Sequence, residues 1–383
     1  MIQFNNRNTQ LDDLLARMAE EIQLDATRKE KMESAYRAIE SLLNEDTGFF
    51  KDALFEIYPQ GSVRIGTTVK PIGKNEFDLD IVVHIVMDWE EYSPQFVYNQ
   101  LKRVLVNSER YRDKVELKNR CIRLNYAGDF HMDILPGCQE TNFDKNKLVV
   151  PDRKLGDWTS SNPRGYGNWF IDKSNQVKMS LLEKAYAMEN LPADEFSKKK
   201  PLQRAVQLIK MYRDEYFNDN KEMATSSIIL TTIAGEFYDG EDSIFDTIDN
   251  IISTIKQSLS NLSLNGERLK VVNPVNNDED FSDKWDEDKE PELYEYFKKF
   301  VAHLDSQWKN LKEDNGVLEE ANILKGLFGE NAYLKAQNSQ VNYIEKARKS
   351  SKIGINTKTG ILTESLAVGI KKVKDNTFFG SER

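Results

Sequence analysis

The sequence predicts an α+β fold, with a mixed α/β first half and a helical second half. Two runs rich in branched apolar residues, Phe77–Val86 and Phe130–Leu135, are typical of strands. Beyond residue 175 the strand signals nearly vanish, and apolar residues recur at helical spacing. The chain has 383 residues, of which 39% are hydrophobic, so it can bury a sizeable core as two domains or one bilobal unit.

The first elements alternate between helix and strand. Apolar residues recur at helical spacing over residues 11–45, and the apolar and aromatic run Ala53–Tyr58 predicts a strand that ends at Pro59. The strand Phe77–Val86 follows, and residues 96–118 again show the helical pattern.

A hairpin and a long loop complete the first half. The runs Cys121–Tyr126 and Phe130–Leu135 are separated by a short glycine-containing link, which is typical of a hairpin. Residues 141–175 hold several prolines, glycines and aromatic residues and predict loops.

The second half is predicted to be helical, with Pro201 in the first turn of its first helix. Further helices are expected at Ser226–Phe237, Ile244–Leu259, Glu290–Leu311 and Val317–Phe328. The acidic stretch Asn276–Glu292 predicts an exposed loop, and the polar end of the chain a loosely held tail. We therefore expect a first lobe with its N-terminal helices over residues 1–175, a helical lobe over 176–345 and a C-terminal segment over 346–383.

Composition excludes several classes of protein. The net charge of −10 argues against a protein that coats duplex DNA. Two cysteines, Cys121 and Cys138, and three histidines supply neither a disulfide framework nor a Cys/His zinc site. The chain shows no signal peptide and no apolar run near the roughly 20 residues that span a bilayer. A cytoplasmic location without membrane attachment is expected.

Three acidic residues in the strand signals predict a metal site. Asp78 and Asp80 alternate with Leu79 and Ile81, so the two carboxylates share one face while the apolar side chains point to the core. Adjacent carboxylates repel each other unless a cation neutralises them, and hard divalent cations prefer oxygen ligands. Asp133 has similar apolar flanks in another strand signal. Three carboxylates on adjacent strands can hold two Mg²⁺ ions about 3.5–4 Å apart.

The upstream pair Gly61-Ser62 predicts a phosphate site. It ends one strand and precedes a possible helix start, where glycine allows close backbone approach and free N–H groups favour anionic oxygens. A bare Gly-Ser or Asp-x-Asp pair is usually a surface feature. In this order, and with apolar flanks, the motifs together predict a nucleotidyl transfer site.

The order of Gly61-Ser62, Asp78-x-Asp80 and Asp133 resembles that of the DNA polymerase β-like nucleotidyltransferase superfamily. Longer segments resemble the bacterial cGAS/DncV-like nucleotidyltransferases (CD-NTases). These segments are Gln60–Thr67, Asp78–Val83, Val150–Arg153, Trp158, Ser161–Pro163 with Gly165-Tyr166 and Trp169-Phe170, Ser226–Leu230, and Asn273–Val275 with Phe281 and Trp285. The resemblance covers about residues 50–290 and extends over the whole chain.

The resemblance implies a polymerase β-like nucleotidyltransferase lobe with a mixed β-sheet, a helical lobe, and an active site in the cleft between them. Asp78, Asp80 and Asp133 would be the catalytic acids and the ligands of two Mg²⁺ or Mn²⁺ ions. The donor nucleotide would be bound by Gln60, Gly61, Ser62, Lys210 and Ser226. Lys210 could instead be a solvated surface residue. Ser226 could be a helix N-cap, and Ser227 is its one-residue alternative.

The resemblance also implies that NTPs, ATP and/or GTP, are joined into a cyclic di- or trinucleotide second messenger of CBASS antiphage defence. A separate effector would read the product, and ancillary CBASS proteins could bind the C-terminal tail at Asn376–Gly380. Without the zinc-binding insertion of the animal relative, activation by duplex DNA is not expected. Two alternatives stay open: a template-independent transferase acting on RNA ends or on a protein, and an inactive nucleotide sensor. Base choice, ring size and linkage are not predicted.

Several other side chains have two interpretations. By strand parity His84 and His131 could approach the acids, or they could be buried structural residues. The aromatic residues Trp158, Tyr166 and Trp169 could stack on bases or close a loop onto the core. Four basic residues are weaker phosphate candidates: Arg64, Lys70, Arg120 and Arg123.

Overall fold

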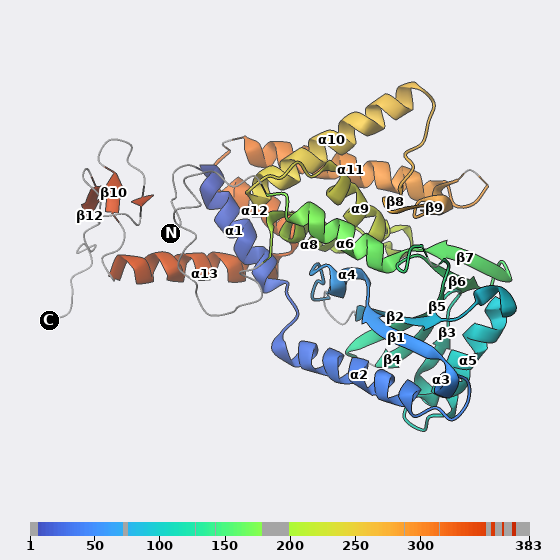
Figure 1. Ribbon diagram of the computed structural model, residues 1–383. Coiled ribbons are helices and arrows are strands. Elements are labelled where there is room, and N and C mark those ends of the chain that lie inside the picture. Colours follow the sequence, from blue (N-terminus) through green and yellow to red (C-terminus); the bar gives the residue numbers. More distant parts are fainter. Residues whose placement is uncertain are drawn as a thin grey trace.

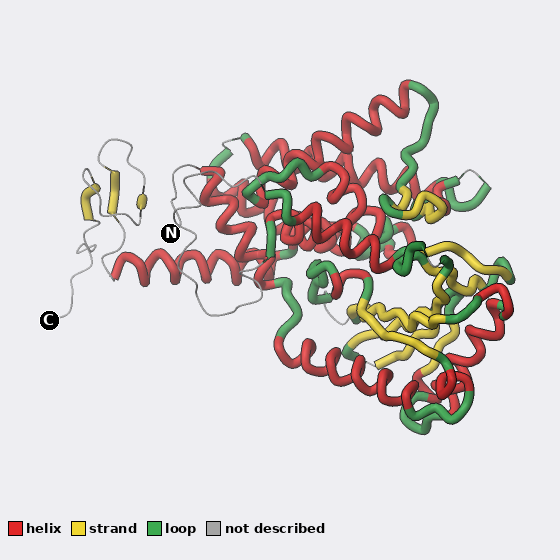
Figure 2. Tube along the Cα trace, viewed as in Figure 1, coloured by secondary structure: helices red, strands yellow, loops and turns green. Residues whose placement is uncertain are grey.

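The computed structural model places a sheet-containing lobe against a helical lobe (Figure 1). It describes residues 7–71, 76–126, 128–141, 143–177, 199–286, 288–313 and 315–349, with three short strands further on, β10 (Gly354–Asn356), β11 (Leu362–Thr363) and β12 (Ile370–Lys372). The predicted α+β class is confirmed, because most strands gather in one lobe and most helices in the other (Figure 2). The predicted docking tail at Asn376–Gly380 lies outside the described residues.

A seven-stranded mixed sheet forms the centre of the first lobe. Its strands are β1 (Leu54–Pro59), β2 (Phe77–Val86), β3 (Val115–Leu117), β4 (Ile122–Tyr126), β5 (Phe130–Gln139), β6 (Leu148–Asp152) and β7 (Asp157–Ser161). The order is β1-β2-β5-β4-β3, and β6 pairs with the end of β5 and with β7. Strands β2 and β5 run parallel, and the other pairs are antiparallel.

The helices are α1 (Arg7–Glu21), α2 (Ala26–Asn44), α3 (Phe49–Asp52), α4 (Gly61–Arg64), α5 (Pro94–Asn107), α6 (Pro163–Ser174), α8 (Pro201–Tyr216), α9 (Ser227–Phe237), α10 (Ile244–Leu264), α11 (Glu292–Lys312), α12 (Val317–Phe328) and α13 (Glu330–Lys349). We call the part from α2 to β7 the N-terminal lobe, and α1 together with α6 to α13 the helical lobe. Within the residues that the structure describes, no helix is long and apolar enough to cross a membrane.

The two faces of the sheet differ because side chains alternate along each strand. On β2, Leu79 and Ile81 are buried in a core with Ile39 of α2 and Leu101 of α5. The opposite face of β2 carries polar side chains and lies toward the helical lobe (Figure 1). The alternation predicted from the sequence therefore buries one face and leaves the other for chemistry.

The helical lobe has a core of its own that includes both α1 and α6. Leu15 of α1 and Phe170 of α6 are buried in the same cluster as Leu208 of α8 and Trp308 of α11. The first helix of the chain therefore packs in the lobe that is formed mainly by the second half. The division at residues 1–175, 176–345 and 346–383 stays a prediction, and the two cores do not follow it at α1 and α6.

Two predicted helices are shorter than expected. The helix predicted over residues 11–45 is two helices, because Asp25 accepts a hydrogen bond from the backbone N–H of Arg28 and so caps a new start for α2. The helix predicted over 96–118 ends with α5, and the edge strand β3 follows.

Two predicted loops contain regular structure. Residues 141–175 hold β6, β7 and α6. Asn162 caps α6 and Pro163 is suited to its first turn, so signals that were interpreted as breakers belong to a helix start. The acidic stretch Asn276–Glu292 begins with β9 (Asn276–Asp280), which pairs with β8 (Val272–Asn273). Helix α13 was not predicted.

The carboxyl of Asp12 gives a pH-dependent prediction for the stability of the helical lobe. Burial raises the pKa of Asp12 to about 6, although backbone hydrogen bonds from Phe245 and Ile244 oppose the shift. Between pH 4 and 6 the folded state keeps a proton that the unfolded state releases, so stability falls as pH rises through this range. Asp12→Asn keeps the Oδ1 acceptor and removes the titration.

We therefore expect the free energy of unfolding of Asp12→Asn, relative to the wild type, to improve by up to about 2 kcal/mol from pH 4 to pH 7. Denaturant unfolding at both pH values measures the difference. A difference that does not depend on pH would contradict the assignment.

Candidate active site

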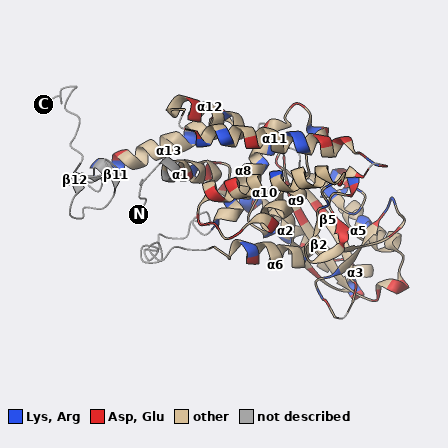
Figure 3. Ribbon diagram, turned by 90° about the horizontal axis from the view of Figure 1, so that it is seen from above, with Lys and Arg blue, Asp and Glu red and all other residues tan. Residues whose placement is uncertain are grey.

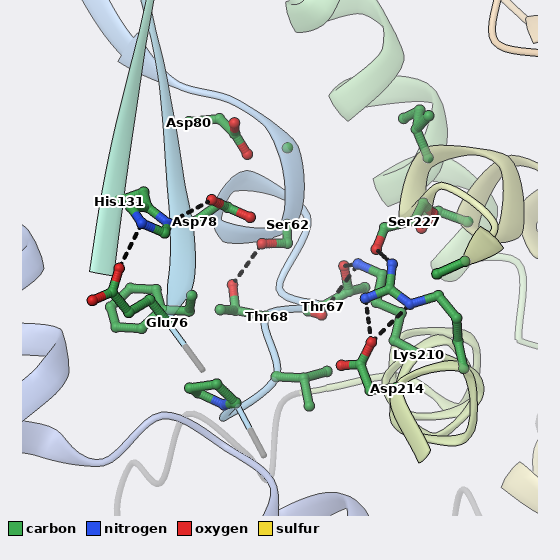
Figure 4. A pocket seen from close by; sticks show the side chains of 18 of the residues that line it. Ser62, Thr67, Thr68, Glu76, Asp78, Asp80, His131, Lys210, Asp214 and Ser227 are labelled. Carbon is green, nitrogen blue, oxygen red and sulfur yellow. Dashed lines mark hydrogen bonds and ion pairs between the residues drawn. The ribbon is translucent and has the colours of Figure 1, made fainter. Parts of the chain in front are cut away.

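The register of two parallel strands brings the acidic residues together. Asp80 of β2 is the direct neighbour of Asp133 on β5, and Asp78 is the neighbour of His131. On the next strand, β4, Arg123 is the antiparallel partner of Asp133. Directly paired residues project from the same face of a sheet, so these side chains form one polar group across three strands. In Figure 4, Asp78, Asp80 and His131 lie on one side of the pocket.

The turn after β1 places Gly61 against Asp80. The backbone N–H of Gln60 donates to the carbonyl of Asp80 over 2.9 Å, which continues the pairing of β1 with β2. Gly61 has φ +58°, and a Cβ at this position would lie 2.5 Å from Oδ2 of Asp80. Glycine is therefore required both by the left-handed backbone and by the closeness of the carboxylate.

The segment after α4 is bound to helix α8. Three side chains at successive turns of α8 donate to it: Gln203 to the carbonyl of Ile65 (2.8 Å), Gln207 to that of Thr68 (2.7 Å), and Lys210 Nζ to Thr67 Oγ1 (2.9 Å) and to its carbonyl (3.4 Å). Thr68 in turn donates to the hydroxyl of Ser62 over 3.2 Å. The helical lobe thereby holds the Gly61-Ser62 turn in place.

A cavity of about 790 Å³ opens between the lobes. The N-terminal lobe contributes Gly61, Ser62, Asp78 and Asp80 to its lining, and the helical lobe contributes Lys210, as predicted from the sequence. Figure 4 shows Ser62 and Lys210 reaching into it from opposite walls. The volume is within the range of about 300–1,000 Å³ that small-molecule sites occupy.

Three predicted site residues do not line the cavity. Asp133 lies behind the side chain of Arg123, and its own side chain is 16% exposed. Gln60 precedes α4 and contributes its backbone rather than its side chain to the pairing described above. Ser226 is exposed at the N-cap position of α9 and its side chain makes no capping bond, whereas Ser227 lines the cavity. Ser227, the one-residue alternative, therefore replaces Ser226.

The carboxylates carry more negative charge than their surroundings neutralise. Burial and the charges of Asp78 and Asp133 raise the pKa of Asp80 to about 7, and burial also raises the pKa of Asp78. Carboxylate oxygens short of counter-charge are the donor set that a hard divalent cation requires. Among the described residues, however, no cluster of three His, Cys, Asp or Glu side chains is arranged to hold a metal ion as it stands.

Lys210 is buried rather than solvated, so the surface alternative for it is wrong. Burial and the nearby charge of Arg213 lower the pKa of Lys210 to about 7, against the opposing charge of Asp80. A lysine with this pKa gains its full charge only when an anion arrives.

Sequence reasoning missed two groups that line the cavity. Arg213, one turn after Lys210, donates to the carboxylate of Asp214 and to the hydroxyl of Ser227. Its spacing of three residues from Lys210 on a helix was the signal that could have found it. On the opposite wall, Glu76 accepts from the backbone N–H of Gly128 (2.6 Å) and pairs with His131 (2.5 Å).

Most of the alternative candidates have structural roles. His84 is buried and bonded to Glu56 over 2.9 Å, and it does not line the cavity. Trp158 packs against Trp89, and Trp169 lies against Gly235. Tyr166 lines the cavity, but its hydroxyl is bonded to Thr232 (3.0 Å).

The basic candidates are engaged by protein groups. Arg64 donates to Asn168 (2.6 Å), and Arg120 pairs with Asp152 (2.8 Å). Arg123 pairs with Asp133, which raises its pKa further, so the guanidinium stays charged. Lys70 is not in the cavity lining.

Comparisons with known proteins agree with this geometry. The family model described as "Second Messenger Oligonucleotide or Dinucleotide Synthetase domain" matches residues 9–175. A protein of Roseivirga ehrenbergii named c-di-GMP synthase is 43% identical over 380 residues, which cover 99% of this chain and all of the relative. The chain belongs to the bacterial CD-NTase family.

Solved structures show that the fold of this CD-NTase is that of the family. The Bradyrhizobium diazoefficiens CD-NTase CdnG in complex with GTP matches with a TM-score of 0.69 at 22% identity, over 86% of this chain and 99% of CdnG. The Vibrio cholerae cyclic AMP-GMP synthase DncV matches with a TM-score of 0.53 at 16% identity, over 84% and 85% of the two chains. The predicted polymerase β-like architecture is confirmed.

This CD-NTase is a nucleotidyltransferase, as predicted from the resemblance. Enzymes of the family generally use divalent metal ions. Its curated relatives are named as synthases of cyclic dinucleotides.

Gly61→Ala tests the closeness of the turn to Asp80. A non-glycine residue at positive φ costs about 1–2 kcal/mol, and here the methyl group would also displace the Asp80 carboxylate. Gly156→Ala is the matched control, because Gly156 has φ +70° with no atom within 4 Å of the added Cβ. We expect Gly61→Ala to lower the free energy of unfolding more than Gly156→Ala in denaturant titrations. Equal losses would contradict the contact with Asp80.

Proposed function

We propose that this CD-NTase joins two molecules of GTP into cyclic di-GMP. The observation that carries the proposal is the register of Asp80 beside Asp133, at one wall of a cavity whose other wall presents Lys210. The choice of GTP rests on the relative that is 43% identical over nearly the whole chain and is named c-di-GMP synthase.

In this proposal Asp78, Asp80 and Asp133 hold two Mg²⁺ or Mn²⁺ ions. Bound divalent ions at such a site supply activation of an attacking hydroxyl and stabilisation of the leaving phosphate. The buried position of Asp80 keeps its oxygens directed into the cavity, and β2 and β5 fix the spacing of the ligands. The chain's own contribution is therefore positioning and exclusion of water.

The donor triphosphate would lie along the Gly61-Ser62 turn. Gly61 permits close backbone approach, the Ser62 hydroxyl can donate, and Lys210 and Ser227 approach from the helical lobe (Figure 4). A ribose hydroxyl of the second GTP would attack the α-phosphate, and pyrophosphate would leave. Attack by the remaining hydroxyl of the linear intermediate on its own α-phosphate would then close the ring. We further propose that a separate effector of CBASS defence reads the product.

The alternative of a template-independent RNA-end transferase has less support. A long nucleic acid is held mainly through its phosphates by clustered basic residues. Figure 3 shows basic and acidic residues interspersed along α11 and α13, and the whole chain has a net charge of −10. The inactive-sensor alternative is disfavoured because Asp78, Asp80 and Asp133 are all present on one face of the sheet.

Incubation with nucleotides tests the reaction. With GTP alone and Mg²⁺ or Mn²⁺, we expect a phosphatase-resistant product with the mass of cyclic di-GMP in mass spectrometry. The double variant Asp78→Asn/Asp80→Asn is expected to lose the product by at least about a thousandfold, since the metal ligands are gone. Product that requires ATP would contradict the choice of GTP, and a fully active double variant would contradict the metal site.

Proton uptake on GTP binding tests Lys210. Because the pKa of Lys210 is lowered to about 7, a triphosphate beside it should raise that pKa again and draw in a proton. Calorimetry of metal-free GTP binding, in buffers of different ionisation enthalpy, should show uptake approaching about one proton at pH 8 and less at pH 6. Lys210→Met should lose this uptake. The same uptake in wild type and Lys210→Met would place the triphosphate elsewhere.

A further inference from the structure

The side chain of Arg123 is bound to two of the three carboxylates at the active site. Its Nε donates to Oδ1 of Asp133 over 2.7 Å, and its Nη2 donates to Oδ2 of the same carboxylate over 2.8 Å. The same Nη2 also reaches Oδ1 of Asp78 over 3.2 Å. Both oxygens of Asp133 are therefore engaged by one guanidinium.

The sheet register produces this ion pair. Arg123 on β4 is the direct partner of Asp133 on β5, so the two side chains project from the same face. The planar fork of an arginine matches the two oxygens of a carboxylate, and such bidentate pairs are among the strongest hydrogen-bonded pairs. Arg123 lines the cavity, whereas Asp133 does not.

This pair conflicts with metal binding at the same carboxylate. A divalent cation that shares Asp133 would stand next to a guanidinium that is already hydrogen-bonded to both oxygens, and like charges repel. The structure shows the outcome, since no three acidic or histidine side chains among the described residues form a ready metal site, although three aspartates share the face. Arg123 supplies the positive charge that a cation would otherwise bring.

We propose that Arg123 is the resting counterion of the active site and gives up at least one oxygen of Asp133 when metal and nucleotide bind together. This role rests on the proposed function, in which Asp133 is a metal ligand. The guanidinium faces the cavity, so an anionic oxygen of the nucleotide can replace the carboxylate as its partner. Metal alone therefore binds weakly, and metal with nucleotide binds strongly.

The test is the affinity for Mn²⁺ without nucleotide, measured from the free Mn²⁺ signal in electron paramagnetic resonance. In Arg123→Gln we expect Mn²⁺ to bind about tenfold more tightly than in the wild type, because the competing charge is gone. Adding a non-hydrolysable GTP analogue should then tighten Mn²⁺ binding less than it does in the wild type. Arg123 is a positioning residue in this scheme, and activity is not the readout.

Arg120→Gln is the matched control. It removes the same charge three residues away, but Arg120 pairs with Asp152 rather than with the catalytic acids. Its Mn²⁺ affinity should stay at the wild-type value. If Arg123→Gln does not fold, as judged by thermal unfolding, Arg123→Lys carries the test with a smaller tightening in the same direction.

Two results would overturn the proposal: unchanged or weaker Mn²⁺ binding by the folded Arg123 variant, or equal tightening in Arg120→Gln. The double variant Asp78→Asn/Asp80→Asn separates this failure from that of the proposed function. If it binds Mn²⁺ as the wild type does, the metal site itself is wrong. If it loses Mn²⁺ while Arg123→Gln matches the wild type, only the role of Arg123 fails.

Discussion

Parallel pairing of β2 with β5 sets Asp80 beside Asp133, and the other parts of the site are arranged around these carboxylates. The pairing forces buried acids together at a place where their charges disfavour ionisation, as the raised pKa of Asp80 shows. Residues on the other face of the same strands, such as Leu79, bind the sheet to its helices. Burial of that apolar face stabilises an arrangement that the polar face alone would oppose.

Helix α8 connects this strained group of charges to the nucleotide cavity. Its residues Gln203, Gln207 and Lys210 hold the segment that follows the Gly61-Ser62 turn, and the turn in turn lies against Asp80. The two lobes are therefore joined through the phosphate-binding region itself. A nucleotide that bridges Ser62 and Lys210 would strengthen the contact between the lobes as well as occupy the site.

Much of the site could be predicted from the sequence because its signals are local. The alternation around Asp78 and Asp80 marks one strand, and the structure places that strand at Phe77–Val86, as predicted. The direct pairing of β2 with β5 was not predictable, because the strands between them in the chain do not lie between them in the sheet. The pair of Arg123 with Asp133 depends on the same long-range register and was missed.

Other failures came from signals with two meanings. Asn162, Pro163 and the nearby glycines are typical of loops, yet the same residues start α6, and only packing of Phe170 into the helical core distinguishes the two. Ser226 and Ser227 differ by one position, and the 100° turn between successive helical residues decides which of them reaches the cavity.

The most direct test of the metal-centred account is a crystal structure with Mn²⁺ and a non-hydrolysable GTP analogue, using the anomalous signal of manganese. The account predicts manganese within about 2.2 Å of carboxylate oxygens of both Asp78 and Asp80, with the triphosphate along Gly61-Ser62. Manganese bound only to the triphosphate, with neither carboxylate as a ligand, would contradict it.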